Sequence, residues 1–407
     1  MAKDSATPRP RLHRNIWVFS LTSFLTDVSS EMLFNLLPLF LLNVLGVRTA
    51  VVGVIEGVAE TTSSLLKVAS GALSDRLGER KNLAVLGYGL SALSKPFLYF
   101  ASTWGWVLGV RFSDRVGKGV RTAPRDALLA GSVRPENRGL AFGLHRAADT
   151  GGAFTGLAIA ALIVWFSQSN LQALTRSTFQ LVVIASLPPA FLAVLILSLG
   201  AREVRTAGTG KKTSLPRWSD VSPRLKAFLG IVILFTLGNS SDAFLILRAQ
   251  ERGLSVLQVM GMLMTFNAIY ALLASPAGLL SDRIGRFRLV LAGWSLYALI
   301  YLGFALAQSG VQAWVLYALY GAYYGLTEGV VRALIADLTP PEQRGTAYGL
   351  YHASVGLTAF PASLLAGLFW QGIGPWQGFG PAAPFYFGAI MAALAALAFF
   401  FWQKQKV

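Results

Sequence analysis

Apolar runs of about 20 residues recur along the whole of this 407-residue chain, and each run is long enough to cross a bilayer as a helix. Only 13% of the residues are charged, about half the share found in soluble globular proteins. The chain is therefore predicted to be an all-α, polytopic membrane protein. We place twelve membrane spans at 16–45, 50–74, 82–101, 104–131, 139–166, 178–200, 226–249, 256–281, 287–307, 312–338, 344–371 and 382–402.

The net charge of +16 is explained by where the basic residues lie, without an acidic partner. Twelve spans place both termini on one side of the membrane. The cations of that side are Lys3, Arg9, Arg11, Arg14, Arg76, Arg80, Lys81, Arg134, Arg138, Arg202, Arg205, Lys211, Lys212, Arg217, Arg224, Lys226, Arg283, Arg286, Arg288, Arg344, Lys404 and Lys406. The opposite loops hold only Arg48, Arg176 and Arg252. This bias predicts that both termini are cytoplasmic in a cell inner membrane, and no nucleic-acid partner is expected. The segment 1–15 has no small-residue cleavage site behind the first apolar run and is interpreted as a retained cytoplasmic tail.

The residue types exclude several kinds of chemistry. The chain has no cysteine, which rules out disulfides, iron–sulfur clusters and thiol chemistry. Its three histidines, His13, His145 and His352, are too far apart in sequence to form a recognisable metal site. A membrane enzyme acting on a lipid or a phosphate ester is a weak alternative, because no nucleophile–base pair is visible. We expect no enzyme activity, no metal and no cofactor other than an ion or proton gradient.

The chain divides into two similar halves. The sequence GALSDRLG at 71–78 recurs as GLLSDRIG at 278–285, and RPENRGLAFGL at 134–144 recurs as PPEQRGTAYGL at 340–350. The offsets of 207 and 206 residues indicate one duplication. We predict an N-terminal six-helix bundle with its tail (1–200), a polar cytoplasmic linker (201–225) and a C-terminal six-helix bundle (226–407).

The pattern G-x-x-x-D-R-x-G-x-R-K at 71–81, with its copy in the second half, resembles the signature loop of the major facilitator superfamily. The resemblance covers essentially the whole chain. It implies two pseudo-symmetric six-helix bundles around a central cavity, lined mainly by 16–45, 104–131, 226–249 and 312–338, and solute transport by alternating access. Residues of these loops and their neighbours form a predicted conformational latch: Gly71, Asp75, Arg76, Gly78, Arg80, Asp126, Asp282 and Arg283. The alternative is a simple turn that follows the positive-inside bias.

Five cations stand inside the predicted span 104–131: Arg111, Arg115, Lys118, Arg121 and Arg125. Each would cost about 2.5–3.5 kcal/mol if it faced lipid. At 100° per residue they fall within about 120° of one another, so we expect one wet, cationic face. Arg111 matches the arginine of a family pattern, R-x-x-Q-G-x-G-x-G, that is tied to proton transfer in proton-coupled members, although Asp114-Arg115 replaces the usual Gln-Gly.

Acids and bases on other spans, among them Glu56, Glu60 and Lys67, are roughly matched in number. The alternative is therefore an internal ion-pair network that holds the helices together. A carboxylate beside an arginine in a cavity of low dielectric constant is nevertheless a suitable proton carrier, because burial favours its neutral form and the cation favours its charged form. The predicted proton-coupling residues are Asp27 and Glu31 first, then Asp242, Glu328, Asp149 and Arg146. The predicted substrate-binding residues are Arg111, Arg115, Lys118, Asn35, Asn239, Tyr324 and Arg332.

Three glycines, Gly143, Gly152 and Gly156, fit the start of the family's antiporter motif, but the Pro-x-x-Gly-Gly that follows it is absent. Small residues at this spacing also serve ordinary helix packing. The motif therefore favours antiport only slightly.

The sequence predicts a monomeric secondary active transporter that is embedded in membrane lipid and moves a small-molecule substrate. Proton coupling and export are favoured, and the cationic face favours an anionic or zwitterionic substrate. One alternative is a multidrug or organic-cation efflux antiporter that uses aromatic side chains near the cavity, among them Trp17, Phe34, Tyr320, Tyr323 and Tyr324. Another is a protein of transporter fold that binds its ligand as a sensor, without transport.

Overall fold

The computed structural model describes residues 13–77, 79–133, 138–204, 221–340 and 343–404, and the structural statements below concern these ranges. Gly78 of the predicted latch and most of the predicted linker 201–225 lie outside the described residues. The side chains of Asp75 and Arg76 also lie outside them.

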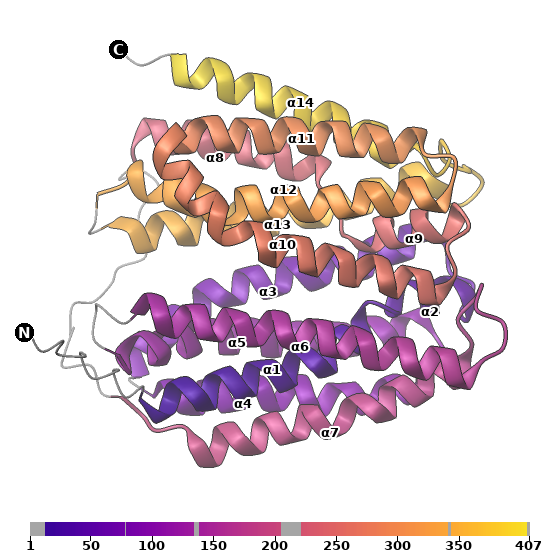
Figure 1. The fold of residues 1–407 in the computed structure, drawn as a ribbon, viewed down its shortest axis with the longest axis horizontal. Helices are drawn as coiled ribbons and strands as arrows, with labels where there is room; N and C mark the ends of the chain where they lie inside the picture. Colours follow the sequence, from indigo (N-terminus) through magenta and orange to yellow (C-terminus); the bar gives the residue numbers. More distant parts are fainter. Residues whose placement is uncertain (1–12, 78, 134–137, 205–220, 341–342, 405–407) are drawn as a thin grey trace, which may run out of the picture.

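Twelve helical spans follow one another along the chain (Figure 1). Those of the first half are α1 (Arg14–Phe34) with α2 (Leu37–Asn43), α3 (Thr49–Leu77), α4 (Arg80–Ser94) with the 3-10 helix η1 (Lys95–Phe100), α5 (Trp104–Gly131), α6 (Arg138–Ser167) and α7 (Arg176–Gly200). Those of the second half are α8 (Pro223–Gly238) with α9 (Ala243–Glu251), α10 (Val256–Ile284), α11 (Arg286–Leu306), α12 (Gly310–Asp337), α13 (Arg344–Gln371) and α14 (Ala383–Lys404). The all-α fold and the twelve predicted spans are confirmed, with ends that differ by three residues or fewer.

Within the described ranges, nine of the spans are long and apolar enough to cross a membrane on length and composition alone. The other three, α3, α5 and α12, are equally long, at 29, 28 and 28 residues, but more polar. Polar and charged side chains inside a bilayer almost always face the interior of the bundle, so these three helices are the first candidates for walls of a site.

The helices of the two halves form two groups in the view of Figure 1, the first half coloured indigo to pink and the second half pink to yellow. Helix α1 begins and α14 ends at the left of this view, which we call the terminal end; the opposite end is the distal end. The two groups meet where α3 packs on α13, which we call the α3–α13 seam, and where α6 packs on α10.

The α3–α13 seam is built on glycine. A Cβ placed on Gly53 would lie 2.3 Å from the carbonyl oxygen of Ser363, and one on Gly356 would lie 2.2 Å from the Cβ of Ser64. The hydroxyl of Thr61 donates to the carbonyl oxygen of Gly356 at 2.5 Å. Small residues let two membrane helices approach backbone to backbone, and here they do so between the two halves of the chain.

The two halves are joined at the distal end and separate toward the terminal end. At the distal end the backbone N–H of Val256 donates to the carbonyl oxygen of Leu171 at 2.8 Å, and that of Thr49 donates to the side chain of Gln371 at 2.8 Å. In the terminal half of α10, eight of the ten residues 271–280 are exposed, which is more of the helix circumference than contact with lipid would account for. The space between the halves therefore opens toward the terminal end.

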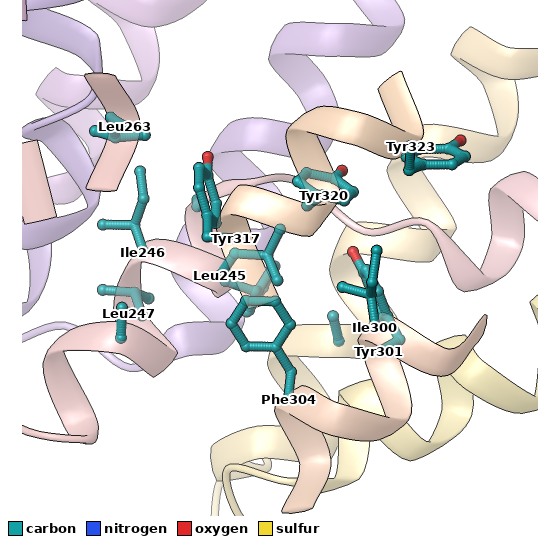
Figure 2. Packing of buried hydrophobic residues seen from close by; sticks show 14 of the residues in the cluster. Leu245, Ile246, Leu247, Leu263, Ile300, Tyr301, Phe304, Tyr317, Tyr320 and Tyr323 are labelled. Atoms are coloured by element: carbon teal, nitrogen blue, oxygen red, sulfur yellow. The ribbon is translucent and has the colours of Figure 1, made fainter. Parts of the chain in front are cut away.

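An aromatic core fills the second half. Figure 2 shows Tyr317, Tyr320 and Tyr323 of α12 close to Tyr301 and Phe304 of α11. The rings of Tyr297 on α11 and Tyr323 on α12 lie 5.0 Å apart between centroids, and both side chains are buried. Packing of this kind fixes α12 against α11 and so orients the face of α12 that looks toward the first half.

Candidate functional site

Two helices are interrupted at matching positions in the two halves. Helix α1 ends at Phe34, and Pro38, which lacks an N–H, stands in the first turn of α2. Helix α8 ends at Gly238, and α9 begins only at Ala243. Asn35 and Ser241 differ by 206 residues, which is the offset of the sequence repeat. The predicted span 226–249 therefore contains a break at 239–242, directly after Gly238.

Non-helical backbone at membrane depth is tolerated only where it lines a cavity or is buried in protein. Asn35 and the whole segment 239–242 line a cavity of about 600 Å³ between the two halves. Interrupted helices at corresponding places in two repeats are the best structural indication of a transporter's binding site. All four predicted cavity spans contribute to this cavity, together with α3, α6, α10 and α13.

Most predicted site residues meet in this cavity. Its walls include Asp27, Glu31, Asn35, Arg111, Arg115, Lys118, Arg146, Asp149, Asn239, Asp242 and Tyr324. Glu328 lines an adjoining recess of about 300 Å³, and Arg332 is ion-paired to it at 2.6 Å. Phe34 also lines the cavity, but Tyr320 and Tyr323 belong to the aromatic core, and Trp17 points away with 59% of its surface exposed. The expectation that these last three serve the cavity was wrong.

The five cations of α5 all face the cavity, as predicted, but their surroundings differ. Arg111 is closed off by Glu56 of α3, whose two carboxylate oxygens accept from its Nε at 3.2 Å and its Nη2 at 2.9 Å. Arg125 pairs with its neighbour Asp126 at 2.8 Å. Arg121 lies over the ring of Tyr88 at 4.3 Å.

Arg115 and Lys118 have no such ion-pair partner. Within the described ranges, no carboxylate lies within 4.0 Å of either cation. Lys67 of α3 likewise has no described carboxylate within 4.0 Å. All three cations lie near the carboxylate of Glu60 without forming an ion pair with it. Three cations thus face the cavity near Glu60 without an ion pair, and Asp114 and Glu56 are further acids in the neighbourhood of Arg115. The ion-pair network that was the alternative to a binding face describes Arg111 and Arg125, but it does not describe these residues.

Three other acids of the cavity accept hydrogen bonds from neutral donors. Asp242 accepts from the hydroxyl of Tyr320 at 2.8 Å, and Glu31 accepts from the side-chain amide of Asn35 at 2.8 Å. Asp149 accepts from the hydroxyl of Ser23. Asp27 is half-buried in the cavity wall, and no described cation lies within 4.0 Å of it. A carboxylate that reaches water and has no fixed cation is free to gain and lose a proton.

One ion pair crosses the cavity. Nη2 of Arg146, on α6, lies 3.4 Å from a carboxylate oxygen of Glu328, on α12. The same nitrogen also contacts the hydroxyl of Tyr270, on α10, which donates to Glu328 at 2.5 Å. The two halves are therefore joined here by charge, 8 residues from the start of α6 and 9 residues from the end of α12.

The second-half copy of the signature loop makes its contacts within that half. Asp282 lies 3.8 Å from Arg286, whose guanidinium also donates to the carbonyl oxygen of Ala333 at 2.8 Å and pairs with Asp337. Gly285 has φ of +93°, in the region that favours glycine. Arg283 is exposed. In the first half, a Cβ on Gly71 would meet only Ala123, at 3.4 Å. A latch between the halves stays a prediction for these loops.

The glycines of the supposed antiporter motif have a packing role at two of three positions. A Cβ on Gly152 or Gly156 would lie 2.4 Å from the carbonyl oxygen of Phe24 or Val28. Nothing lies within 4 Å of a Cβ on Gly143. Gly152 and Gly156 therefore allow α6 to pack directly on α1.

Sequence reasoning missed three polar side chains near the site. Lys95 is buried, and its ammonium donates to the hydroxyls of Ser29 at 2.6 Å and Ser30 at 3.0 Å; an isolated lysine in an apolar run was a visible signal. Tyr270 and Asn267, which line both the cavity and the recess, were hidden in an apolar segment with nothing to mark them.

Comparisons with known proteins agree along the whole length of the chain. The sequence profile described as Major Facilitator Superfamily matches residues 19–326 and 227–407. A relative named an uncharacterized MFS-type transporter, from Methanocaldococcus jannaschii, is 34% identical over 396 residues, which are 96% of this chain and 95% of the relative. A multi-drug resistance efflux pump PmrA homolog of Lactococcus lactis is 24% identical over 368 residues, 87% and 88% of the two chains. The solved structure of the nucleoside transporter NupG has the same fold, with a TM-score of 0.74 at 13% identity over 96% of this chain and all of that one.

Proposed function

This chain belongs to the Major Facilitator Superfamily, and from that premise we propose that it is a proton-coupled secondary transporter that exports a small anionic or zwitterionic solute across the cell inner membrane. It works as a monomer with both termini in the cytoplasm. Substrate binds in the cavity between the halves, and the two halves open it alternately to either side.

The observation that carries this proposal is the cluster of Arg115, Lys118 and Lys67 in the cavity wall around Glu60, with no described carboxylate within 4.0 Å of any of the three. Cations without ion-pair partners at membrane depth are expensive, so a site that keeps three of them is suited to an anionic guest. A carboxylate or phosphate group that enters can accept charge-assisted hydrogen bonds from the guanidinium and the ammonium groups.

The shape of the cavity supports alternating access. The distal end is joined by direct hydrogen bonds between the halves, whereas the terminal end is open. With the termini in the cytoplasm, this is the state that admits a cytoplasmic solute. Asp27 is the proposed proton carrier, because it meets the cavity and lacks a fixed cation.

The test is transport by purified protein in proteoliposomes, with an imposed pH gradient and a panel of small carboxylates, phosphates and zwitterions. Candidates are first screened by thermal shift on the wild type and on Arg115→Gln. We expect an anionic ligand that stabilises the wild type and loses its effect in the variant. That ligand should show counterflow, and its net movement should follow the pH gradient. Stabilisation without counterflow would support a sensor instead, and uptake that ignores the gradient would remove the proton role.

A second candidate is efflux of organic cations or multiple drugs. It is favoured by the acids Asp27, Glu31 and Asp242, which face the cavity without a described cation within 4.0 Å. The relative from Lactococcus lactis also carries the name of a multidrug pump. The same assay separates the two, because a pure cation would not depend on Arg115.

A further inference from the structure

The recess beside the cavity differs in chemistry from the cationic face of α5. It has a volume of about 300 Å³ and lies between α10 and α12. Four aromatic rings line it: Phe266, Tyr270, Tyr317 and Tyr324. The ring of Tyr324 stands edge-on to Phe266 at 5.6 Å and to Tyr270 at 6.3 Å.

The charges that line the recess are mostly negative. Three carboxylates reach it, those of Glu31, Asp242 and Glu328, against the single cation of Arg146. Glu328 is also bound by Arg332 at 2.6 Å, so it is partly neutralised from its own helix. Glu31 and Asp242 are held only by Asn35 and Tyr320, both neutral. Aromatic faces combined with carboxylates are the surroundings that favour an organic cation.

A cation of this kind is already seated there. The guanidinium of Arg146 comes from α6 in the other half, and its carbon lies 5.1 Å from the centroid of the Tyr270 ring. Its Nη2 is 3.4 Å from Glu328. The side chain of Arg146 is 54% exposed, so it reaches this position through solvent-accessible space and is not locked by packing.

We propose that this recess is a binding subsite for the guanidinium or ammonium group of the substrate, and that Arg146 occupies it when substrate is absent. The proposal rests on the proposed transport function and narrows it to zwitterions. The anionic group binds at Arg115, Lys118 and Lys67 of the first half, and the cationic group binds in the recess, most of whose lining comes from the second half.

The proposal has a mechanical consequence. A substrate cation must displace Arg146 from Tyr270 and Glu328, so binding breaks an ion pair that joins the two halves. The substrate then replaces that pair by its own contacts to both halves. Occupancy is thereby linked to the relative position of the halves through differential contacts, as a ligand-driven shift requires.

The test uses the purified full-length protein in detergent and two probes of the same shape, ethylguanidinium and the neutral ethylurea, with binding measured by calorimetry. We expect the wild type to bind ethylguanidinium and not ethylurea. Arg146→Ala should bind ethylguanidinium at least tenfold more tightly, because the internal competitor is gone. Adding Tyr270→Leu or Glu328→Gln to Arg146→Ala should weaken binding at least tenfold. Tyr386→Leu, at a tyrosine of α14 that is 42% exposed, is the matched control and should change nothing.

Unchanged or weaker ethylguanidinium binding in Arg146→Ala would overturn the proposal, as would equal binding of ethylurea. If Arg146→Ala does not fold, spin labels on the wild-type background decide. The chain has no cysteine, so Leu140→Cys on α6 and Leu279→Cys on α10 can be labelled without interference. Ethylguanidinium should lengthen the distance between these labels, and an unchanged distance would contradict the proposal.

Binding of inorganic phosphate tests the anionic site of the proposed transport function separately from the recess. Phosphate binding should be lost in Arg115→Gln and kept in Tyr270→Leu. A protein that binds ethylguanidinium but no anion would refute the anionic half of the proposed function and leave the recess as a cation site. A protein that binds phosphate but not ethylguanidinium would refute the recess alone.

Discussion

Arg111 of α5 and Glu56 of α3 form a two-pronged ion pair, with Nε to Oε1 at 3.2 Å and Nη2 to Oε2 at 2.9 Å. Their side chains are only 5% and 11% exposed. The planar guanidinium matches the carboxylate in this geometry, and two charge-assisted hydrogen bonds join the two groups. Arg111 therefore joins two helices, and the open cations of the same face, Arg115 and Lys118, are the better candidates to meet a ligand.

Breaking this pair should destabilise the protein. Glu56→Gln leaves the Arg111 guanidinium buried without its main countercharge, and we expect a loss of about 3–5 kcal/mol in the free energy of unfolding. Arg111→Met combined with Glu56→Met should recover part of that loss, because both charges of the pair are removed and only the buried Asp114, 3.9 Å from Arg111, loses a contact. Thermal and denaturant unfolding in detergent measure both. Asp126→Asn is the control: its carboxylate is 43% exposed, so its loss should stay below about 1 kcal/mol.

Substitutions at the open cations should affect binding more than stability. Arg115→Gln and Lys118→Gln each remove a charge-assisted hydrogen bond to an anionic group, worth about 1.5–3 kcal/mol, so KM or Kd for the substrate should rise about tenfold or more. The melting temperature should change little, because no described carboxylate loses a partner. Lys404→Gln, on the exposed end of α14, should leave both quantities as in the wild type. A large drop in melting temperature with unchanged KM would assign these cations to structure.

Asp27→Asn should separate transport from the proton gradient. The amide fills the same space as the carboxylate but cannot carry a proton, so exchange of substrate across the membrane should persist while accumulation driven by a pH gradient is lost. Counterflow and gradient-driven uptake in the same proteoliposome preparation give the comparison. Wild-type accumulation in Asp27→Asn would transfer the role to another carboxylate of the cavity.

The glycines of α6 provide a matched pair of sites. Gly156→Ala places a methyl group 2.4 Å from the carbonyl oxygen of Val28, so α1 and α6 must move apart, and we expect a loss of about 1–3 kcal/mol in stability. Gly143→Ala meets nothing within 4 Å and should be neutral or slightly stabilising. Unfolding in detergent distinguishes the two. Loss of exchange in Gly143→Ala at full stability would instead favour the antiporter motif.

The orientation in the membrane can be tested with single cysteines, since the chain has none of its own. Ser169 is exposed at the distal end and Arg283 at the terminal end. An impermeant maleimide should label Ser169→Cys in intact cells and Arg283→Cys only after the membrane is opened. The reverse pattern would place the termini outside and invert the assignment of export.

Sequence alone predicted the fold well because its signals are additive over long windows. A run of about 20 apolar residues specifies a span whichever neighbours it packs against. The face of α5 was equally predictable, since helical periodicity alone collects Arg111, Arg115 and Lys118 on one side. Both properties are local to one helix.

The partners of each charge could not be predicted, because they depend on how helices are arranged across the bundle. Glu56 and Glu60 lie one turn apart on α3. Their spacing does not predict that Glu56 forms an ion pair with Arg111 while Glu60 forms none with Arg115. The same holds for Arg146 and Tyr270, whose contact joins residues 124 positions apart in opposite halves. The aromatic core was misjudged for a related reason: Tyr320 and Tyr324 lie one turn apart on α12, yet only Tyr324 lines the cavity.

The α3–α13 seam bears on how such a protein can move at all. Helices whose large side chains interdigitate must separate before they can rotate against each other. At Gly53 and Gly356 the contact has no glycine side chain that could interdigitate with the opposite helix. Rotation of α3 against α13 therefore requires few side chains to disengage. The glycines thus suit this contact to act as a pivot in the proposed transport cycle, and bulk added there should slow the swing of the halves even where it leaves the resting protein intact.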